Sequence, residues 1–453
     1  MARVLLIQPN ENIKDKKPRE VYTPLSLIYL ATHIEDKHDV KIYDRNINWD
    51  DNHFFNFLQD YKPDIVGFTG TASEILFDII HLGKIIKKNQ PKILIIVGGV
   101  LATFDPDCFL NEPYIDYVIR GEGEGAFLEF CNVFDTNPKN LKNILNVNKN
   151  PLRPLMDMAK LKIPNYDLID FEKYDDFFIS LSRGCPGNCT FCYNAQMWGK
   201  NNNPIVRIYS LEQSQEIFRR VHDKYHIKVF HIIDDNFLFF KQRCIEICNL
   251  IKKYNFHFDT GGRADNINDD ILDALKKAGC HTIFIGAESG SQRILNLLGK
   301  KTSIQTNADA IKLCKKHKII CDAQFMIGLP TETSEELKET INFIKNNNPD
   351  IPNVKIYNPL PAKLFDYCIS QGLLTKPKTL EEWANFGGIS GFHRNVSKIP
   401  DKELEETMKK LRKYKFLRRN IKRFIFWIQI GESKYALQTA SKIIKEKIAN
   451  FIR

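Results

Sequence analysis

Three cysteines stand close enough together in this sequence to act as one chemical group. Cys185, Cys189 and Cys192 form a C-x3-C-x2-C run, in a segment that also holds Pro186 and Gly187. A structural zinc site takes four protein ligands, and the second Cys or His pair that would complete one does not follow here. Three sulfurs instead suit a four-iron cluster whose fourth iron is left open to bind a substrate or cofactor.

Two plainer interpretations of the cysteine run stay open at this point. The three residues can be ordinary core cysteines that are close by chance, or a zinc knuckle that lacks its fourth ligand. The tight spacing, and an apolar strand pattern directly before the run, favour the cluster.

A series of alternating strand and helix patterns surrounds the cysteine run. Strands are expected at 177–181, 229–233, 257–260, 282–285, 322–327 and 354–357, and helices at 211–225, 242–254, 269–278, 308–316 and 335–345. These are six βα units, too few for a complete eight-fold barrel. Each strand ends at polar or glycine residues, which is where βα barrels keep their chemistry.

The first part of the chain has the same rhythm with shorter, fully apolar strands. We expect strands at 4–7, 40–43, 65–68, 93–97 and 117–119, and helices at 25–34, 51–60 and 73–88. Continuous apolar strands that alternate with helices predict a doubly wound, flavodoxin-like parallel sheet. Ligands of such sheets bind beyond the carboxyl ends of the strands, where Gly98 and Gly99 lie.

The composition limits the kind of protein. The 453 residues suggest two or three domains, and 43% of them are hydrophobic. Eleven cysteines in a chain of this size argue for a reducing compartment. The N-terminus begins as a strand rather than a signal peptide, so we expect a cytoplasmic protein. No apolar run is long enough to span a membrane.

The cysteine run resembles the cluster motif of the radical S-adenosylmethionine (SAM) superfamily, in which an aromatic residue, here Phe191, precedes the last cysteine. The resemblance implies a partial (β/α)6 barrel, a [4Fe-4S] cluster held by Cys185, Cys189 and Cys192, and SAM on the open iron.

Further segments resemble the same superfamily and suggest SAM contacts. Asp234 and Asp235 stand where relatives carry an acidic turn near the methionine end of SAM. Glu288 and Ser289 belong to a G-x-E-S-G stretch, and Glu288 is the main candidate for a polar SAM contact. Arg263, at the end of its strand, can pair with a carboxylate. Residues 325–333 resemble a G-L-P-x-x-T segment that often lines the adenine side, whereas 358–363 depart from the P-G-T turn usual there. Each of these residues can equally be a turn or a helix cap.

The first 130 residues resemble the cobalamin-binding domain that precedes many radical SAM cores. The resemblance includes the strand at 4–7 with its Gln-Pro-Asn end, and it extends through Gly98 and Gly99 to the segment 116–124. The D-x-H-x-x-G motif is absent, so cobalamin would bind without a protein histidine on cobalt. A flavodoxin-like module that binds a substrate, or that has lost its cofactor, is the alternative. Residues 1–130 contain only Cys108, which excludes the second cluster of the methylthiotransferase branch.

The resemblance implies a cobalamin-dependent radical SAM enzyme. We predict a C-methyltransferase that acts on an unactivated carbon through a 5′-deoxyadenosyl radical, with SAM also giving the methyl group to cobalamin. A cyclase or rearrangement enzyme of the same architecture and a cobalamin-free radical SAM enzyme are the alternatives. A redox or cobalamin sensor is the non-enzymatic alternative. A flavodoxin or ferredoxin is expected as electron donor, and the sequence does not name the substrate.

We predict a cobalamin-binding domain at 1–133, a surface linker at 134–176, a radical SAM core at 177–394 and a basic helical segment at 395–453. Residues 401–453 hold 15 Lys and Arg against 6 Asp and Glu. We expect a solvated helical cap over the barrel mouth. A membrane-surface helix that uses Phe424, Phe426 and Trp427 beside their cationic neighbours is the second interpretation. No nucleic-acid-binding module is visible. Six further cysteines fall in helices or strands and are expected to be core residues: Cys244, Cys248, Cys280, Cys314, Cys321 and Cys368.

Overall fold

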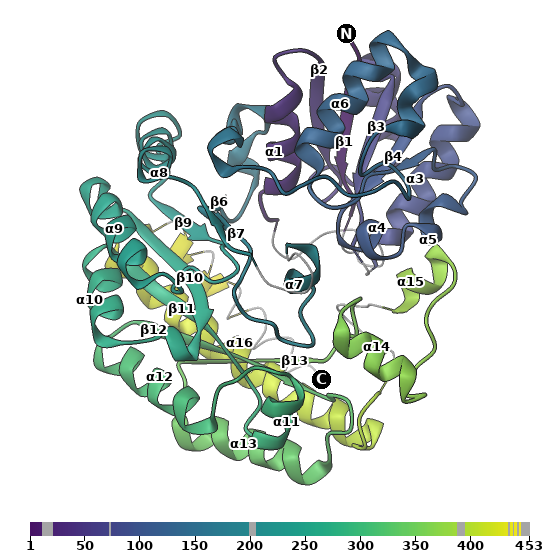
Figure 1. The fold of residues 1–453 in the computed structure, drawn as a ribbon. Coiled ribbons are helices and arrows are strands. Elements are labelled where there is room, and N and C mark those ends of the chain that lie inside the picture. The colour runs from purple at the N-terminus through teal and green to yellow at the C-terminus, as the bar shows by residue number, and fades with distance from the viewer. Residues whose placement is uncertain are drawn as a thin grey trace. The chain divides into compact units, whose positions relative to one another are not determined.

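The structure is a computed structural model that describes residues 1–10, 21–71, 74–198, 205–386 and 395–433, and seven more residues between 435 and 444. The chain divides into two compact units. The first contains Met1–Ile179, Phe191–Gln213 and Pro359–Arg394, and the second contains Ser180–Thr190, Ser214–Asn358 and Asn395–Arg453. Each unit is described by itself, and Figure 1 labels their elements.

The first unit is built on a five-stranded parallel sheet with the order β2-β1-β3-β4-β5. The strands are β1 (Arg3–Gln8), β2 (Asp39–Asp44), β3 (Ile65–Thr69), β4 (Leu94–Gly98) and β5 (Tyr117–Val118). The longer helices are α1 (Leu25–Ile34), α2 (Asp51–Tyr61), α3 (Ile75–Asn89) and α6 (Gly123–Thr136), with short α4 (Val100–Phe104) and α5 (Asp107–Leu110) between them. This is the predicted doubly wound fold. The expected start of α3 at Ser73 lies outside the described residues.

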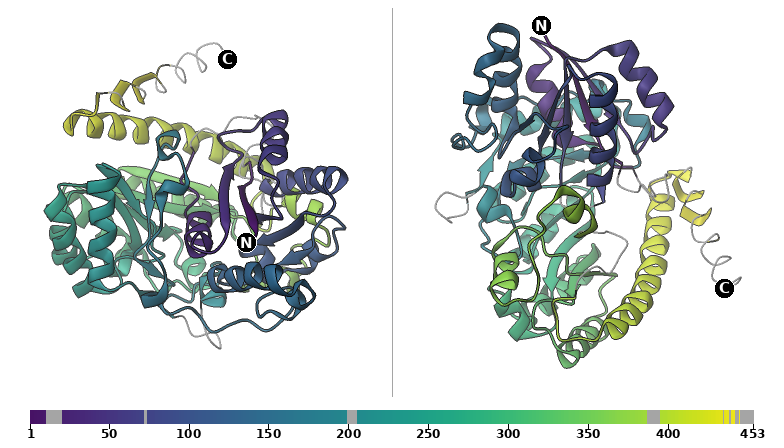
Figure 2. Two further views of the ribbon diagram at one scale, coloured as in Figure 1. Left: turned by 90° about the horizontal axis from the view of Figure 1, so that it is seen from above. Right: turned by 90° about the vertical axis from the view of Figure 1, so that its right-hand side faces the viewer.

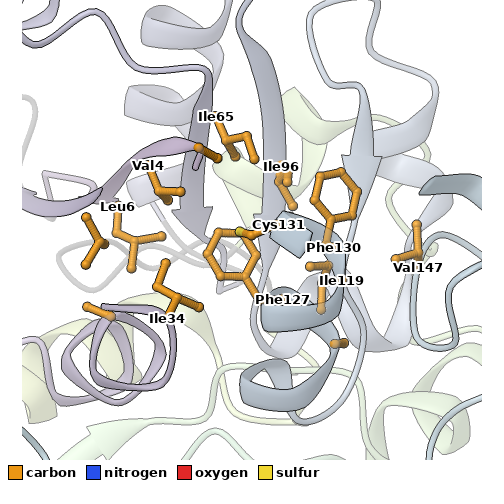
Figure 3. Close-up of a cluster of buried hydrophobic side chains, with 14 of the residues drawn as sticks. Val4, Leu6, Ile34, Ile65, Ile96, Ile119, Phe127, Phe130, Cys131 and Val147 are labelled. Carbon is orange, nitrogen blue, oxygen red and sulfur yellow. The ribbon is translucent and has the colours of Figure 1, made fainter. Parts of the chain in front are cut away.

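Helices α1 and α6 pack against one face of this sheet, as the cluster of buried side chains in Figure 3 shows. Val4 and Leu6 of β1 point into it because alternate residues of a strand face the same side. Phe127 and Phe130 come from α6, and Ile34 comes from α1.

The predicted linker differs from the expectation of a surface segment. It contains short 3-10 turns at Pro138–Asn143, Met158–Lys160, Tyr166–Leu168 and Phe171–Lys173. Leu141, Ile144 and Val147 are buried in the same cluster as β1 and α6. The segment therefore belongs to the first unit. Periodicity does not reveal its buried apolar side chains, because they are spaced irregularly along the sequence.

The second sheet has six strands in the order β13-β12-β11-β10-β9-β6, and its pairs are parallel where their register is given. Its strands are β6 (Phe178–Ile179), β9 (Val229–Ile232), β10 (His257–Arg263), β11 (Cys280–Glu288), β12 (Ile320–Ile327) and β13 (Ile351–Ile356). The main helices between them are α8 (Leu211–Arg219), α9 (Lys241–Ile251), α10 (Asp269–Lys277), α12 (Ile304–Lys316) and α13 (Ser334–Asn347). Short elements are β7 (Ser182–Arg183), β8 (Arg207–Ile208), α7 (Asn194–Met197) and α11 (Gln292–Leu297). The six predicted βα units are confirmed, and the six cysteines expected in the core are all buried.

Residues that follow β13 belong to the first unit. The predicted boundaries differ, because they assign these residues to the radical SAM core at 177–394. They contain α14 (Lys363–Ser370) and α15 (Leu380–Phe386), and α15 lies against α3. Trp383 is fully buried, and its indole nitrogen donates a 2.9 Å hydrogen bond to Asp105 Oδ2.

The basic C-terminal segment forms the long helix α16 (Asp401–Gln429), which runs beside β13 (Figures 1 and 2). Its first turn meets α13, where Ser334 donates to Glu403 at 2.6 Å, and its last turns reach the start of β11, where the rings of Phe426 and His281 are 4.0 Å apart. The helix therefore runs from the carboxyl ends toward the amino ends of the strands and does not simply cap the barrel mouth. Residues 445–453 of the predicted segment lie outside the described part.

Candidate functional site

The loop after β7 brings two of the three predicted cluster ligands to one point. The Gly187 N–H donates to Cys185 Sγ at 3.4 Å, and a Cβ placed on Gly187 would lie 3.4 Å from Cys185 Sγ and 3.7 Å from Cys189 Sγ. Both thiols are half-buried, and burial raises the pKa of the Cys185 thiol. The loop thus offers two converging sulfurs beside a residue without a side chain, which suits a bulky inorganic group.

Cys192 is also half-buried, and it lies in the first unit. Within the described residues, no group of three or more His, Cys, Asp or Glu side chains is arranged to hold a metal ion. The assignment of Cys185, Cys189 and Cys192 as cluster ligands therefore stays a prediction, carried by their spacing and by the convergence of the first two.

Two acidic residues at the end of β9 fix the backbone that leads into the cysteine loop. Asp234 accepts hydrogen bonds from Leu181 N and Ser182 Oγ, both at 2.6 Å, and burial raises its pKa to about 6. Asp235 Oδ2 accepts from Gly184 N at 2.9 Å. Asp235 was predicted to contact SAM; its contact here positions the residue before Cys185.

Arg263, the last residue of β10, points its guanidinium at the cysteine loop. Its Nη1 lies 3.5 Å from Cys189 Sγ. Its Nε and Nη2 make a bidentate pair with Asp265, both at 2.9 Å, and Nη2 also donates to the carbonyl of Lys300. Arg263 thus links the end of β10 to a predicted cluster ligand, a contact that the sequence did not reveal.

Glu288, the main candidate for a SAM contact, is held by a lysine that the sequence reasoning missed. Lys300 Nζ lies 2.8 Å from Glu288 Oε1, and both side chains are buried. Glu288 has a left-handed backbone (φ 63°) at an irregularity in the β11–β12 pairing. A Cβ on Gly286 would lie 2.4 Å from Glu288 Oε1 and 2.7 Å from Lys300 Nζ, so a side chain at this position would displace the pair. A single lysine after a short helix carries no sequence signal of this role.

Ser289 has the contacts of a turn residue. It is fully buried, its hydroxyl lies 3.2 Å from Thr340 Oγ1, and it accepts from Ser291 N at 3.1 Å. Its assignment to SAM stays a prediction, and these bonds support the plainer turn interpretation.

Glu332, in the segment that resembles G-L-P-x-x-T, is a further buried carboxylate. Its Oε2 accepts from Gly328 N at 2.7 Å and Leu329 N at 3.0 Å, which fixes the turn after β12. Oε1 is buried and has no hydrogen-bond partner among the described residues. Burial raises the pKa of this carboxyl to about 7.

In the first unit, backbones meet closely at the carboxyl ends of β3 and β4. Gly70 N donates to Gly98 O at 2.7 Å, and a Cβ on Gly99 would lie only 2.6 Å from Gly70 O. Gly99 has a φ of 103°, which side chains rarely allow. Glycine therefore lets the loops after β3 and β4 approach each other closely at the edge of the sheet where ligands of this fold bind.

Two protein-family models match the chain, one at the predicted radical SAM core and one at the predicted cobalamin-binding domain. The radical SAM superfamily model matches residues 179–344, and the B12 binding domain model matches residues 16–130. An uncharacterised methyltransferase of Pyrococcus horikoshii is 34% identical over 395 residues, which are 83% of this chain and 84% of that protein. The chain belongs to the radical SAM superfamily.

Solved structures in this superfamily share the fold. The radical SAM methyltransferase TsrM from Kitasatospora setae matches with a TM-score of 0.67 at 15% identity, covering 83% of this chain and 78% of TsrM. The cobalamin-dependent SAM radical enzyme OxsB matches with a TM-score of 0.64 at 22% identity, covering 82% of this chain and 56% of OxsB. An anaerobic magnesium-protoporphyrin IX monomethyl ester cyclase of Rubrivivax gelatinosus is 28% identical over 387 residues, which are 79% of this chain and 68% of the cyclase.

Membership confirms the predicted enzyme class and its cofactors. A radical SAM enzyme uses a [4Fe-4S] cluster and SAM, and the B12 binding domain adds cobalamin. Such enzymes also need an electron donor. The residues present fit these groups, because two thiols converge beside Gly187, and Gly98 and Gly99 lie at the carboxyl end of β4, where ligands of such sheets bind. In the part of the chain that the structure describes, no helix is long and apolar enough to cross a membrane.

Proposed function

We propose that this radical SAM enzyme transfers the methyl group of SAM to an unactivated carbon of its substrate. The observation that carries the proposal is the presence, in one chain, of a cysteine loop with converging thiols and a B12 binding domain whose β3 and β4 are followed by closely packed glycines. The similarity over most of the chain to a protein named a methyltransferase supports it.

Within this proposal each unit has its own task. Cys185, Cys189 and Cys192 would hold the cluster, and Gly98 and Gly99 would face cobalamin. Bound together, the cluster and SAM supply a radical that removes hydrogen from carbon, and cobalamin supplies the methyl group. The chain itself orients these groups: Asp234 and Asp235 fix the cysteine loop, and Glu288 with Lys300 fixes the end of β11. We retain 1–133 as the cobalamin-binding domain, and we place the radical SAM core at 177–358.

The test follows the methyl group and does not need the substrate. The enzyme is reconstituted anaerobically with iron, sulfide and hydroxocobalamin, reduced, and given SAM with a labelled methyl group. We expect S-adenosylhomocysteine and labelled methylcobalamin to form. Cys189→Ala is the control for the cluster: it should abolish formation of 5′-deoxyadenosine and leave methyl transfer to cobalamin intact.

A cyclase or rearrangement enzyme is the second candidate, and the cyclase relative favours it. The same experiment separates the two. Sustained formation of 5′-deoxyadenosine, with bound cobalamin that never receives the label, would contradict the methyltransferase and support the second candidate.

We propose a flavodoxin or ferredoxin as the electron donor and the cytoplasm as the place of action. The reason is chemical, because a cluster with an open iron is sensitive to oxygen and needs a strong one-electron reductant.

We also propose a peripheral membrane contact through α16. The face of the helix that makes this contact differs from the one expected, which contained Phe424, Phe426 and Trp427. Arg418 and Lys422 bind the turn before β13, at 2.6 Å to Pro349 O and 2.8 Å to Asp350, and Phe426 is buried. The outward face of the helix instead carries exposed apolar side chains at helical spacing, namely Tyr414, Leu417, Ile421, Ile425 and Ile428. Exposed cations precede them at Lys410 and Lys413.

Such a face suits an anionic lipid surface. We expect the enzyme to sediment with vesicles that contain anionic lipid, and Leu417→Glu/Ile421→Glu to reduce this. Equal sedimentation of the wild type with and without vesicles would contradict the contact.

A further inference from the structure

Arg263 lies beside Cys189, a position from which it can affect the reduction potential of the cluster. We propose that Arg263 raises the reduction potential of the cluster by donating an N–H···S hydrogen bond to the ligand Cys189. The inference rests on the proposed assignment of Cys189 as a cluster ligand. It assigns to Arg263 a positioning role beside its pairing with the Asp265 carboxylate.

Contacts within the protein hold the guanidinium in one orientation. Asp265 holds Nε and Nη2 in a bidentate pair at 2.9 Å, and Nη2 also donates to the carbonyl of Lys300. The Arg263 side chain is only 13% exposed. With these nitrogens engaged, Nη1 is directed to Cys189 Sγ at 3.5 Å.

Residues around Arg263 reinforce this orientation. Lys300, whose carbonyl accepts from Arg263, is itself tied to Glu288 by the buried ion pair. A Cβ on Gly262 would lie 2.8 Å from two Leu238 side-chain carbons, so the strand end passes close to its neighbour. The donor is therefore part of a connected set of contacts from β10, β11 and the turn that holds Lys300.

Electrostatics determines the direction in which Arg263 shifts the reduction potential of the cluster. Adding an electron makes the cluster and its thiolates more negative, and a hydrogen bond to a ligand sulfur stabilises that added charge. The pairing with Asp265 leaves the side chains together close to neutral, so the oriented N–H, rather than a free positive charge, provides the stabilisation. Without Arg263 the reduced cluster is less stable, and its potential becomes more negative.

The experiment is a redox titration of the reconstituted enzyme, followed by the electron paramagnetic resonance signal of the reduced cluster. Arg263→Gln removes the guanidinium, and Arg263→Lys keeps the positive charge without the planar guanidinium and its fixed N–H donors. Arg293→Gln is the matched control, because Arg293 makes the same bidentate pair with Glu336, with both contacts at 2.6 Å. Iron content is measured for every variant.

We expect a more negative midpoint potential in Arg263→Gln, a shift of similar size in Arg263→Lys, which keeps the charge but not the oriented N–H, and the wild-type value in Arg293→Gln. A wild-type potential in Arg263→Gln, with full iron content, overturns the inference and leaves the proposed function intact. If Arg263→Gln does not retain iron, the midpoint potential of Arg263→Lys is compared with the wild type instead. Loss of iron from both variants would show that Arg263 is needed for the structure of the site and would overturn its effect on the potential. A wild-type protein that binds no cluster overturns the proposed function itself.

Discussion

At the scale of single residues, the end of β11 depends on a buried charged pair. Glu288 and Lys300 are both buried, and their charged atoms are 2.8 Å apart. Removing one partner of a buried pair is more costly than removing both, because the remaining charge is left without compensation.

Lys300→Met should therefore lower the free energy of unfolding by about 3–5 kcal/mol. The double variant Lys300→Met/Glu288→Gln should recover part of that loss, since no unpaired charge remains. Urea denaturation of the wild type, the single variant and the double variant measures both effects. A double variant that is less stable than Lys300→Met would contradict the argument.

Glu332 gives the molecule a specific dependence on pH. Burial raises the pKa of its carboxyl to about 7 from an ordinary 4.5, so the folded state binds the proton more tightly than the unfolded state. Its contribution to stability is complete below about pH 4.5 and is lost as the pH rises through 7.

Glu332→Gln keeps an acceptor for Gly328 N and Leu329 N and cannot ionise. The stability difference between variant and wild type should shift in favour of the variant by about 3 kcal/mol between pH 4.5 and 8. Urea denaturation at several pH values measures the shift. A difference that does not vary with pH would show that Glu332 is not the group that titrates.

At the scale of elements, the loops after β3 and β4 approach each other closely at Gly70 and Gly99. Gly99→Ala places a methyl group 2.6 Å from Gly70 O at a φ of 103°, so the two loops must separate. We expect a loss of stability greater than the roughly 1–3 kcal/mol of an unfavourable backbone conformation alone, together with weaker retention of cobalamin after desalting.

Gly372→Ala is the matched control for Gly99→Ala. Gly372 also has a positive φ, 66°, but no atom of the described part of the chain lies within 4 Å of its added Cβ. It should show only the backbone cost and retain cobalamin normally. Thermal unfolding and bound-cobalt content of the two variants separate the steric clash from the conformational strain. Equal losses in both would contradict the close-approach argument.

At the scale of the whole molecule, the chain leaves the first unit and returns to it. Residues after β13 carry Trp383 back to Asp105, and α15 packs on α3. Trp383→Ala should destabilise the first unit by about 3–5 kcal/mol, because a fully buried aromatic side chain is removed.

Hydrogen exchange locates the effect of Trp383→Ala. Amides of α3 and β4 should exchange faster in the variant, and amides of β11 and β12 should keep their wild-type rates. Trp383→Phe, which keeps the ring and loses the hydrogen bond, should show a smaller change. Faster exchange confined to β11 and β12 would contradict the assignment of this segment to the first unit.

The sequence by itself determined the order of elements and the class of chemistry. Strands such as Leu94–Gly98 and helices such as Leu25–Ile34 follow from local apolar periodicity, and the cysteine spacing is a property of the chain alone. Only the tertiary structure decided that Lys300 pairs with Glu288, that Arg263 reaches Cys189, that the outward face of α16 is apolar, and that Trp383 returns to the first unit. These contacts join residues from 12 to 278 positions apart, or depend on which helix face meets the barrel. Local periodicity carries no information about such distances, because they are set by packing after the elements have formed.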